Sequence, residues 1–172
     1  MKQIILILFV LTTLSGVAQD FPEKEILKKL KADKIEVDEG NEDGVFKARN
    51  KKNQKWGMFQ WMSEGTKMIE LVPMQYDSLN YFPYNGNFTA VYNRGKVGFY
   101  LSHWTYGDMA KQTVPCIYEA FQRYTPEDGI IRLAVRKGGK WGWVDWLTGE
   151  EKTEFIYYTK EDLPYPNWEQ KY

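Results

Sequence analysis

Residues able to carry out chemistry are few in this chain. Its 172 residues include one histidine, His103, and one cysteine, Cys116. Ser102 precedes His103, but adjacent residues of a strand point to opposite faces of a sheet, whereas a serine–histidine site needs the base aimed at the nucleophile. One histidine and one cysteine are too few ligands for a structural zinc site within one chain. We therefore expect no catalytic residue, no metal and no cofactor.

Other kinds of active site find little support in the residues. The Gly138-Gly139 pair lies between two runs typical of strands, whereas a phosphate-binding glycine loop opens a helix. The 23 acidic residues offer many carboxylate pairs of the kind that glycosidases use. A polymer hydrolase therefore stays open as a minor alternative, although a chain this short and regular is a poor host for one.

A series of aromatic residues is better placed for binding. Trp61, Trp104 and Trp146 stand just beyond the second strand of three successive predicted hairpins, and a glycine closes each loop, at positions 65, 107 and 149. Flat aromatic rings offer apolar contact at low entropic cost, so three exposed tryptophans on one face would form a platform for a sugar or a peptide. The alternative, which regular aromatic positions in repeat proteins favour, is that these tryptophans pack between the repeats.

The hairpin that leads to Trp146 is the clearest structural signal in the chain. Gly138-Gly139 supplies the positive φ angles of a two-residue turn between two runs that alternate as strands do. With this turn, Arg136 faces Trp141 and Ala134 faces Trp143 on one side of the ribbon. The other side carries the apolar residues that we expect to form the core face: Ile131, Leu133, Val135, Val144 and Trp146.

This hairpin belongs to a unit that recurs. Three segments align on a glycine, and the glycines are 41 and 44 residues apart: Lys55-Trp56-Gly57, Lys96-Val97-Gly98 and Lys140-Trp141-Gly142. A Pro-x-x-Tyr-acid motif follows the first two segments, at 73–77 and 115–119, whereas the third has residues 154–158 without the proline. Self-similarity at a fixed period is the signature of a repeat architecture. We therefore expect three units within residues 45–159.

The Lys-Trp-Gly segments and the Pro-x-x-Tyr-acid motifs together resemble the WG-repeat (KWG-repeat) family. The resemblance covers about two thirds of the chain, and both Val97 and the third unit depart from it. It implies a β-rich repeat module, found often in secreted bacterial proteins, without a general set of catalytic residues. We expect an all-β fold: three WG-type units of antiparallel hairpin plus strand, forming a repeated meander or solenoid-like array, with a short N-terminal helix. Closure into a barrel-like or propeller-like form is an alternative that the sequence leaves open.

The N-terminal segment predicts export. Lys2 gives a positive start, residues 4–14 are apolar but far shorter than the roughly 20 residues that span a bilayer, and small residues follow up to Ala18. We interpret residues 1–18 as a signal peptide, which predicts a secreted or periplasmic protein with no membrane span after cleavage. Cys116 has no second cysteine to pair with, so packing must hold the domain together.

The segments on either side of the three units are expected to cover their ends. Residues 19–44 read as a helix and an acidic linker, with Asp20 and Glu23 as a capping box and the helix running to Asp33. The acidic loop 38–44 does not match the ligand spacing of an EF-hand calcium site. The C-terminal tail, residues 160–172, contains an aromatic–proline segment at 163–168 that we expect to lie across the last unit.

The charge distribution does not indicate a nucleic-acid partner, because the 23 basic and 23 acidic residues balance and no basic stripe stands out. The sequence therefore predicts a non-catalytic secreted repeat module that binds a protein, a peptide or a glycan, with Trp61, Trp104 and Trp146 as the candidate ligand-binding residues. The alternatives are a structural envelope protein without a small ligand and, less favoured, the polymer hydrolase.

Overall fold

The computed structural model describes residues 22–37, 44–62, 67–80, 88–101, 110–125 and 129–168. These residues form three antiparallel sheets and one helix, α1 (Glu23–Leu30), so the all-β class with a short N-terminal helix is confirmed. The predicted signal peptide 1–18, most of the acidic loop and the stretch with Ser102, His103 and Trp104 lie outside the described residues.

Each sheet is built from strands that follow one another in the chain. The first sheet has the order β1-β2-β3-β4: β1 (Ala32–Val37), β2 (Val45–Asn50), β3 (Trp56–Trp61) and β4 (Met68–Tyr76). The second has the order β5-β6-β7-β8: β5 (Ser78–Leu79), β6 (Phe88–Asn93), β7 (Lys96–Leu101) and β8 (Gln112–Tyr118). The third has the order β9-β10-β11: β9 (Ala120–Tyr124), β10 (Arg132–Lys137) and β11 (Lys140–Val144).

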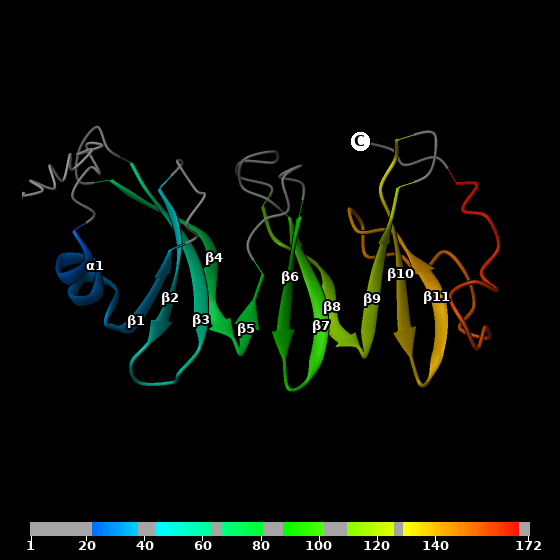
Figure 1. The fold of residues 1–172 in the computed structure, drawn as a ribbon, viewed down its shortest axis with the longest axis horizontal. Helices are drawn as coiled ribbons and strands as arrows, with labels where there is room; N and C mark the ends of the chain where they lie inside the picture. The colour runs from blue at the N-terminus through cyan, green and yellow to red at the C-terminus, as the bar shows by residue number, and fades with distance from the viewer. Residues whose placement is uncertain are drawn as a thin grey trace, which may run out of the picture.

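The sheets follow one another along the long axis of the molecule, with α1 at one end and the C-terminal tail at the other (Figure 1). Three apolar clusters lie between these layers. The first joins α1 to the first sheet: Ile26, Phe46, Ala48 and Phe59. The second joins the first and second sheets and includes Met58, Val72, Tyr76 and Val91. The third joins the second and third sheets and includes Phe88, Phe99, Leu133, Val144 and Trp146.

A middle layer of this kind buries both faces of its strands. In β6, Ala90 belongs to the cluster shared with the third sheet, and its neighbour Val91 belongs to the cluster shared with the first. Since successive side chains point to opposite faces, such a strand must be apolar along most of its length. This requirement explains the run Phe88-Thr-Ala-Val91, in which all four residues are buried.

The predicted hairpin register is confirmed. Arg136 lies opposite Trp141, Ala134 opposite Trp143, and Gly138 and Gly139 have φ angles of 59° and 75°. The predicted core side is confirmed too, because all five of its apolar residues belong to the cluster between the second and third sheets. The opposite side, with Ala134 and Trp143, is also buried, and that burial was not expected.

The aligned glycines face a bulge in the neighbouring strand. In the first sheet Trp56 pairs with Tyr76 and Met58 with Val72, so Gly57 alone spans residues 73–75. In the second sheet Val97 pairs with Tyr118 and Phe99 with Val114, so Gly98 alone spans residues 115–117. The bulge begins at the proline of each Pro-x-x-Tyr-acid motif, a position where a missing backbone N–H is tolerated.

Close approach of the two backbones at the bulge explains why glycine is needed. A Cβ atom on Gly57 would lie 2.7 Å from the carbonyl oxygen of Val72, and one on Gly98 would lie 2.4 Å from that of Val114. The third sheet has no strand equivalent to β4 or β8 in the described part of the chain. Only two isolated bridges, Trp141–Tyr157 and Val144–Glu151, pair β11 with the residues that follow it. The nearest atoms to a Cβ atom on Gly142 would be those of the Phe155 ring, at 3.1 Å, and not backbone atoms.

A single acidic residue forms the corner where one sheet passes to the next. Asp77 lies between β4 and β5, and Glu119 between β8 and β9; we call these two residues the corner carboxylates. Each accepts a hydrogen bond from the turn of the following hairpin: Asp77 from the backbone N–H of Arg94, and Glu119 from those of Gly138 and Gly139. Each also pairs with a lysine of the preceding sheet, Lys55–Asp77 and Lys96–Glu119.

Two predictions for the N-terminal region were wrong. The helix begins at Glu23 with Pro22 as its N-cap residue and no side-chain capping bond, so Asp20 is not the cap. The helix ends at Leu30, and Lys31 then takes a left-handed conformation with φ 52°. Part of the expected linker, Ala32–Val37, is strand β1, which pairs with β2 at the edge of the first sheet.

Candidate functional site

The outer face of the third sheet carries an aromatic site that the tail completes. Trp143 of β11 is buried, and its indole Nε1 donates a hydrogen bond of 2.9 Å to the carbonyl oxygen of Pro164. Tyr124 of β9 and Trp168 of the tail flank it, with ring centroids 5.8 Å and 6.0 Å from that of Trp143. The tail therefore lies across the last sheet, as the aromatic–proline segment predicted.

Arg132 fixes the far end of this tail segment. Its guanidinium lies 5.4 Å from the ring centroid of Trp168, and Nη2 donates a 3.3 Å hydrogen bond to the Trp168 carbonyl oxygen. Nη1 donates a 2.8 Å bond to the carbonyl oxygen of Ile130. A buried guanidinium needs such acceptors, and here they tie strand β10 to the tail.

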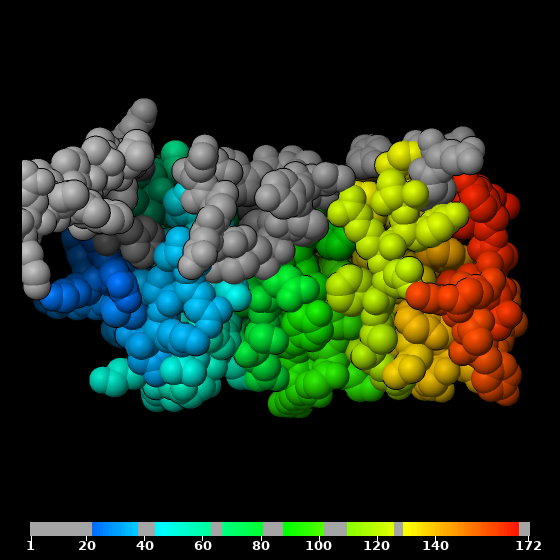
Figure 2. All heavy atoms as spheres, in the orientation of Figure 1, coloured from blue at the N-terminus to red at the C-terminus, as the bar shows by residue number. Residues whose placement is uncertain are grey.

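A hollow of about 360 Å³ lies between the tail and this face of the sheet. Ten residues line it: Gln122, Tyr124, Ala134, Trp143, Lys160, Glu161, Leu163, Pro164, Tyr165 and Pro166. The rims are aromatic and accessible, since Tyr165 is 62% exposed and Tyr124 is 40% exposed. Figure 2 shows the orange and red tail lying against the yellow strands at this end of the molecule.

The lining combines two kinds of contact. Tyr124, Trp143 and Tyr165 offer aromatic surface, and Gln122, Lys160 and Glu161 offer polar groups. The ammonium of Lys160 donates a hydrogen bond to the Gln122 side-chain oxygen and lies 3.7 Å from a Glu161 carboxylate oxygen. Small ligands are usually held by an apolar wall with a few polar groups that fix their orientation, and aromatic rings suit the flat faces of sugars and peptide side chains.

Of the three predicted tryptophans, Trp146 is placed for packing. It is 1% exposed, packs against Phe88 at a ring-centroid distance of 5.2 Å, and donates a 3.0 Å hydrogen bond from Nε1 to the carbonyl oxygen of Ile131. A buried ring with its N–H paired offers no surface to a ligand, so the packing alternative describes Trp146. The loop behind it is fixed as well, because the hydroxyl of Thr113 donates a 2.6 Å bond to its carbonyl oxygen.

Of the other two predicted tryptophans, the structure describes only Trp61. Trp61 ends β3, is half-buried, and packs against the cluster between α1 and the first sheet. Trp104 lies outside the described residues, as do the loop glycines Gly65 and Gly107. A ligand role for Trp61 and Trp104 therefore stays a prediction.

Cys116 has the most nucleophilic side chain among the described residues, and its surroundings lower the reactivity of the thiol. The thiol is half-buried and lies 3.5 Å from the carbonyl oxygen of Val91, and burial raises its pKa. Nowhere in the described part of the chain do three or more histidine, cysteine, aspartate or glutamate side chains converge as a metal ion would need.

The sequence held a partial signal for the aromatic hollow. The tail segment 163–168 was expected on the last unit, and Trp143 was expected on the side of the hairpin away from the core. Tyr124 and Tyr165 were missed, because nothing local indicates that two residues so far apart in the chain form opposite rims of one hollow.

Comparison with protein-family models finds no match, and neither curated proteins nor solved structures give one. Within the described residues, no helix has the length and apolar composition that a membrane span requires.

Proposed function

We propose that the chain is a non-catalytic binding module whose ligand, a protein segment, a peptide or a glycan, enters the aromatic hollow on the third sheet. The observation that carries this proposal is the combination of aromatic rims and polar lining groups around one hollow of about 360 Å³. That volume accommodates part of an extended chain, such as a sugar unit or one peptide side chain with its backbone.

The mode of binding follows from the way the tail is already held. Trp143 donates its N–H to a carbonyl oxygen of an extended segment, and its ring has aromatic neighbours on two sides. Aromatic surfaces with one well-placed donor are used to bind extended, proline-rich segments and other stiff chains, because little conformational entropy is lost. The ligand would contact Tyr124 and Tyr165, the accessible rims.

The finer description of the protein belongs to the same proposal. We regard the three sheets as WG-type repeats in a solenoid-like array, which the recurring bulge opposite Gly57 and Gly98 supports. The signal-peptide character of residues 1–18 supports a secreted or periplasmic location.

Binding should be measured with the purified chain by intrinsic tryptophan fluorescence, against panels of oligosaccharides and of proline-containing peptides. We expect one panel to give saturable binding that falls at least about tenfold when Tyr124 and Tyr165 are both changed to alanine. The control is Tyr158→Ala, which removes an exposed tyrosine outside the hollow. Binding that persists in the Tyr124→Ala, Tyr165→Ala variant would remove the hollow as the site.

A structural role without a small ligand is the second candidate. It is favoured by the burial of Trp146 and of both faces of β6, since these aromatic and apolar residues serve cohesion between sheets. A folded chain that binds no member of either panel would favour this role over the first.

A further inference from the structure

Basic side chains gather at the tips of the three hairpins, which all lie at the same end of the strands (Figure 1). We define the hairpin tips as residues 49–55, 94–96 and 136–140. Of these fifteen residues nine are basic and none is acidic. The basic residues are Arg49, Lys51, Lys52, Lys55, Arg94, Lys96, Arg136, Lys137 and Lys140. The chain as a whole has equal numbers of basic and acidic residues, so this end concentrates positive charge.

Carboxylates that reach the tips neutralise only part of this charge. Asp33 pairs with Arg49 at 2.9 Å and Glu151 with Lys137 at 2.8 Å. The corner carboxylates contribute two more, so four negative charges face nine positive ones, a net of +5. Surface pairs of this kind are weak and are screened by salt, and they leave most of the positive potential in place.

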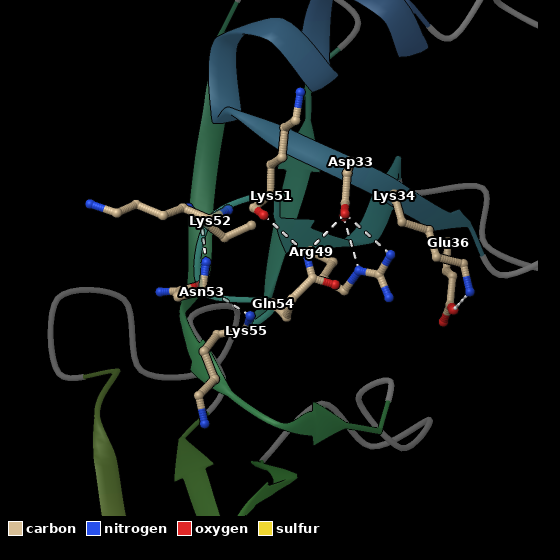
Figure 3. Close-up of polar contacts among 10 residues, drawn as sticks. Asp33, Lys34, Glu36, Arg49, Lys51, Lys52, Asn53, Gln54 and Lys55 are labelled. Atoms are coloured by element: carbon tan, nitrogen blue, oxygen red, sulfur yellow. Dashed lines mark hydrogen bonds and ion pairs between the residues drawn. The ribbon is translucent and has the colours of Figure 1, made fainter.

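Three tip cations make no side-chain ion pair. Lys51, Lys52 and Arg94 are exposed, and no carboxylate of the described residues lies within ion-pair distance of their side chains, although Asp77 accepts the backbone N–H of Arg94. Figure 3 shows the side chains of Lys51, Lys52 and Lys55 extending in different directions from the first tip, whereas Asp33 is turned toward Arg49 and Gln54. A hollow of about 500 Å³ beside this tip is lined by Lys31, Asn50, Lys51 and Lys52.

The tips form a row of fixed spacing. The corner carboxylates tie each tip to the next, because Asp77 contacts Lys55 and Arg94, and Glu119 contacts Lys96 and Gly138. Sheets packed face to face lie about 10 Å apart, so positive charge recurs along the row at about that interval. A row of this kind matches a linear chain of regularly spaced negative charges better than it matches a single small anion.

We propose that the row of hairpin tips binds a linear anionic polysaccharide, one that carries carboxylate or sulfate groups along its length. No apolar or aromatic side chain occurs among the fifteen tip residues themselves, so the row has no apolar group of its own to insert into a lipid layer. Only one exposed ring, that of Tyr158, stands beside a tip cation in the described residues, next to Lys140 at the third tip, whereas stacking on successive nucleic-acid bases needs several such rings. This surface is separate from the aromatic hollow, and its binding does not depend on the proposed function.

The test compares three forms of the purified chain for binding to polygalacturonate at low and at moderate salt. The tip variant carries Lys51→Gln, Lys52→Gln and Arg94→Gln. The matched control carries Lys28→Gln, Lys67→Gln and Lys111→Gln, which remove the same charge from exposed positions outside the tips. We expect the tip variant to bind at least about tenfold more weakly at low salt, with a shallower salt dependence, and the control to bind nearly as the unchanged chain does.

Dextran, single-stranded DNA and vesicles of anionic phospholipid serve as competing probes. Equal weakening in the tip variant and the control variant would overturn the proposal, and so would absence of binding to polygalacturonate. If the chain binds the DNA or the vesicles more tightly than polygalacturonate, and the tip variant loses that binding, the row is assigned to that partner and the polysaccharide proposal is overturned. Equal binding to uncharged dextran would show that charge is not recognised, which also overturns it.

Discussion

The ammonium of Lys55 lies 2.6 Å from the carboxylate of Asp77, which also accepts a hydrogen bond from the backbone N–H of Arg94. One side chain therefore joins the first hairpin tip to the second, across the corner between two sheets. Glu119 makes the equivalent contacts between the second and third tips. The acid of the Pro-x-x-Tyr-acid motif thus has a structural role that explains its position after the tyrosine.

The corner carboxylates should make stability depend on acid pH. Contact with Lys55 lowers the pKa of Asp77, and the backbone N–H of Gly139 lowers the pKa of Glu119. A pKa that is lower in the folded than in the unfolded state gives stability that is present above the unfolded pKa, about 4, and is lost as pH falls through the folded pKa. Urea unfolding between pH 7 and pH 3 should show this loss.

A variant with both Asp77→Asn and Glu119→Gln should lose less stability over the same fall in pH. The control is Glu154→Gln, which removes a different exposed carboxylate. Identical acid dependence in the double variant and the unchanged chain would contradict the assignment of the two corners.

The aligned glycines should differ in their tolerance of alanine. Gly57→Ala and Gly98→Ala place a methyl group against a backbone carbonyl that cannot move away alone, so each should lower the free energy of unfolding by about 1–3 kcal/mol or more. In Gly142→Ala the nearest neighbours of the new methyl group are ring atoms of the Phe155 side chain, at 3.1 Å, and not backbone atoms. Its cost should be less than half as large, and equal costs at all three positions, measured by urea unfolding, would contradict the bulge argument.

Tyr76 should make stability depend on alkaline pH. Burial raises its pKa to about 12, and its hydroxyl donates a 3.0 Å hydrogen bond to the Gln112 side-chain oxygen. A pKa that is higher in the folded state gives stability that is complete below the unfolded pKa, about 10, and is lost as pH rises through the folded value. Tyr76→Phe should flatten this alkaline loss in unfolding curves between pH 9 and pH 12, and an unchanged slope would argue against it.

Trp146 should be inaccessible to iodide in the folded chain. The tryptophan fluorescence that is lost in Trp146→Phe should be fluorescence that iodide does not quench in the unchanged chain. The fluorescence that is lost in Trp61→Phe should be partly quenched by iodide. Trp146→Phe should also lower the free energy of unfolding by about 1–3 kcal/mol, because a packed ring and its hydrogen bond to Ile131 are lost. Strong iodide quenching of Trp146 would instead restore it as a candidate ligand contact.

Local patterns predicted the hairpin and its core side correctly, because a two-residue turn fixes the register and period two then assigns the faces. The alignment marked Gly57 and Gly98 as equivalent, but the bulge opposite each of them was not predicted, because it depends on a backbone contact with a strand further along the chain. Strand β1 was missed because Asp33, Lys34 and Glu36 make it read as a polar linker, as suits an exposed edge strand.

The candidate sites were harder to predict than the fold. Trp146 occupies a regular position, and regularity alone does not distinguish an exposed ring from an inter-sheet contact. The aromatic hollow depends on which face of the last sheet the tail covers. The basic row depends on three tips that are separated by some forty residues each in the sequence, so a scan for consecutive basic residues finds short separate pairs and not the row.

The corners also determine how such a chain can grow. A duplicated copy of residues 78–119 placed after Asp77 would begin behind one acidic corner and end with another, Glu119. The turn of the copy would donate its backbone N–H to the acid before it, as Arg94 does to Asp77. The lysine of the copy would pair with the acid at its own end, as Lys96 does with Glu119. The outermost sheets differ, because α1 covers the first and the tail covers the third. In the third sheet Lys140 lies over the ring of Tyr158, which takes the place in the repeat that Asp77 and Glu119 have in the first two units. We therefore expect an added unit to fit between the sheets in the middle of the chain, whereas α1 and the tail already occupy the outer faces of the first and third sheets.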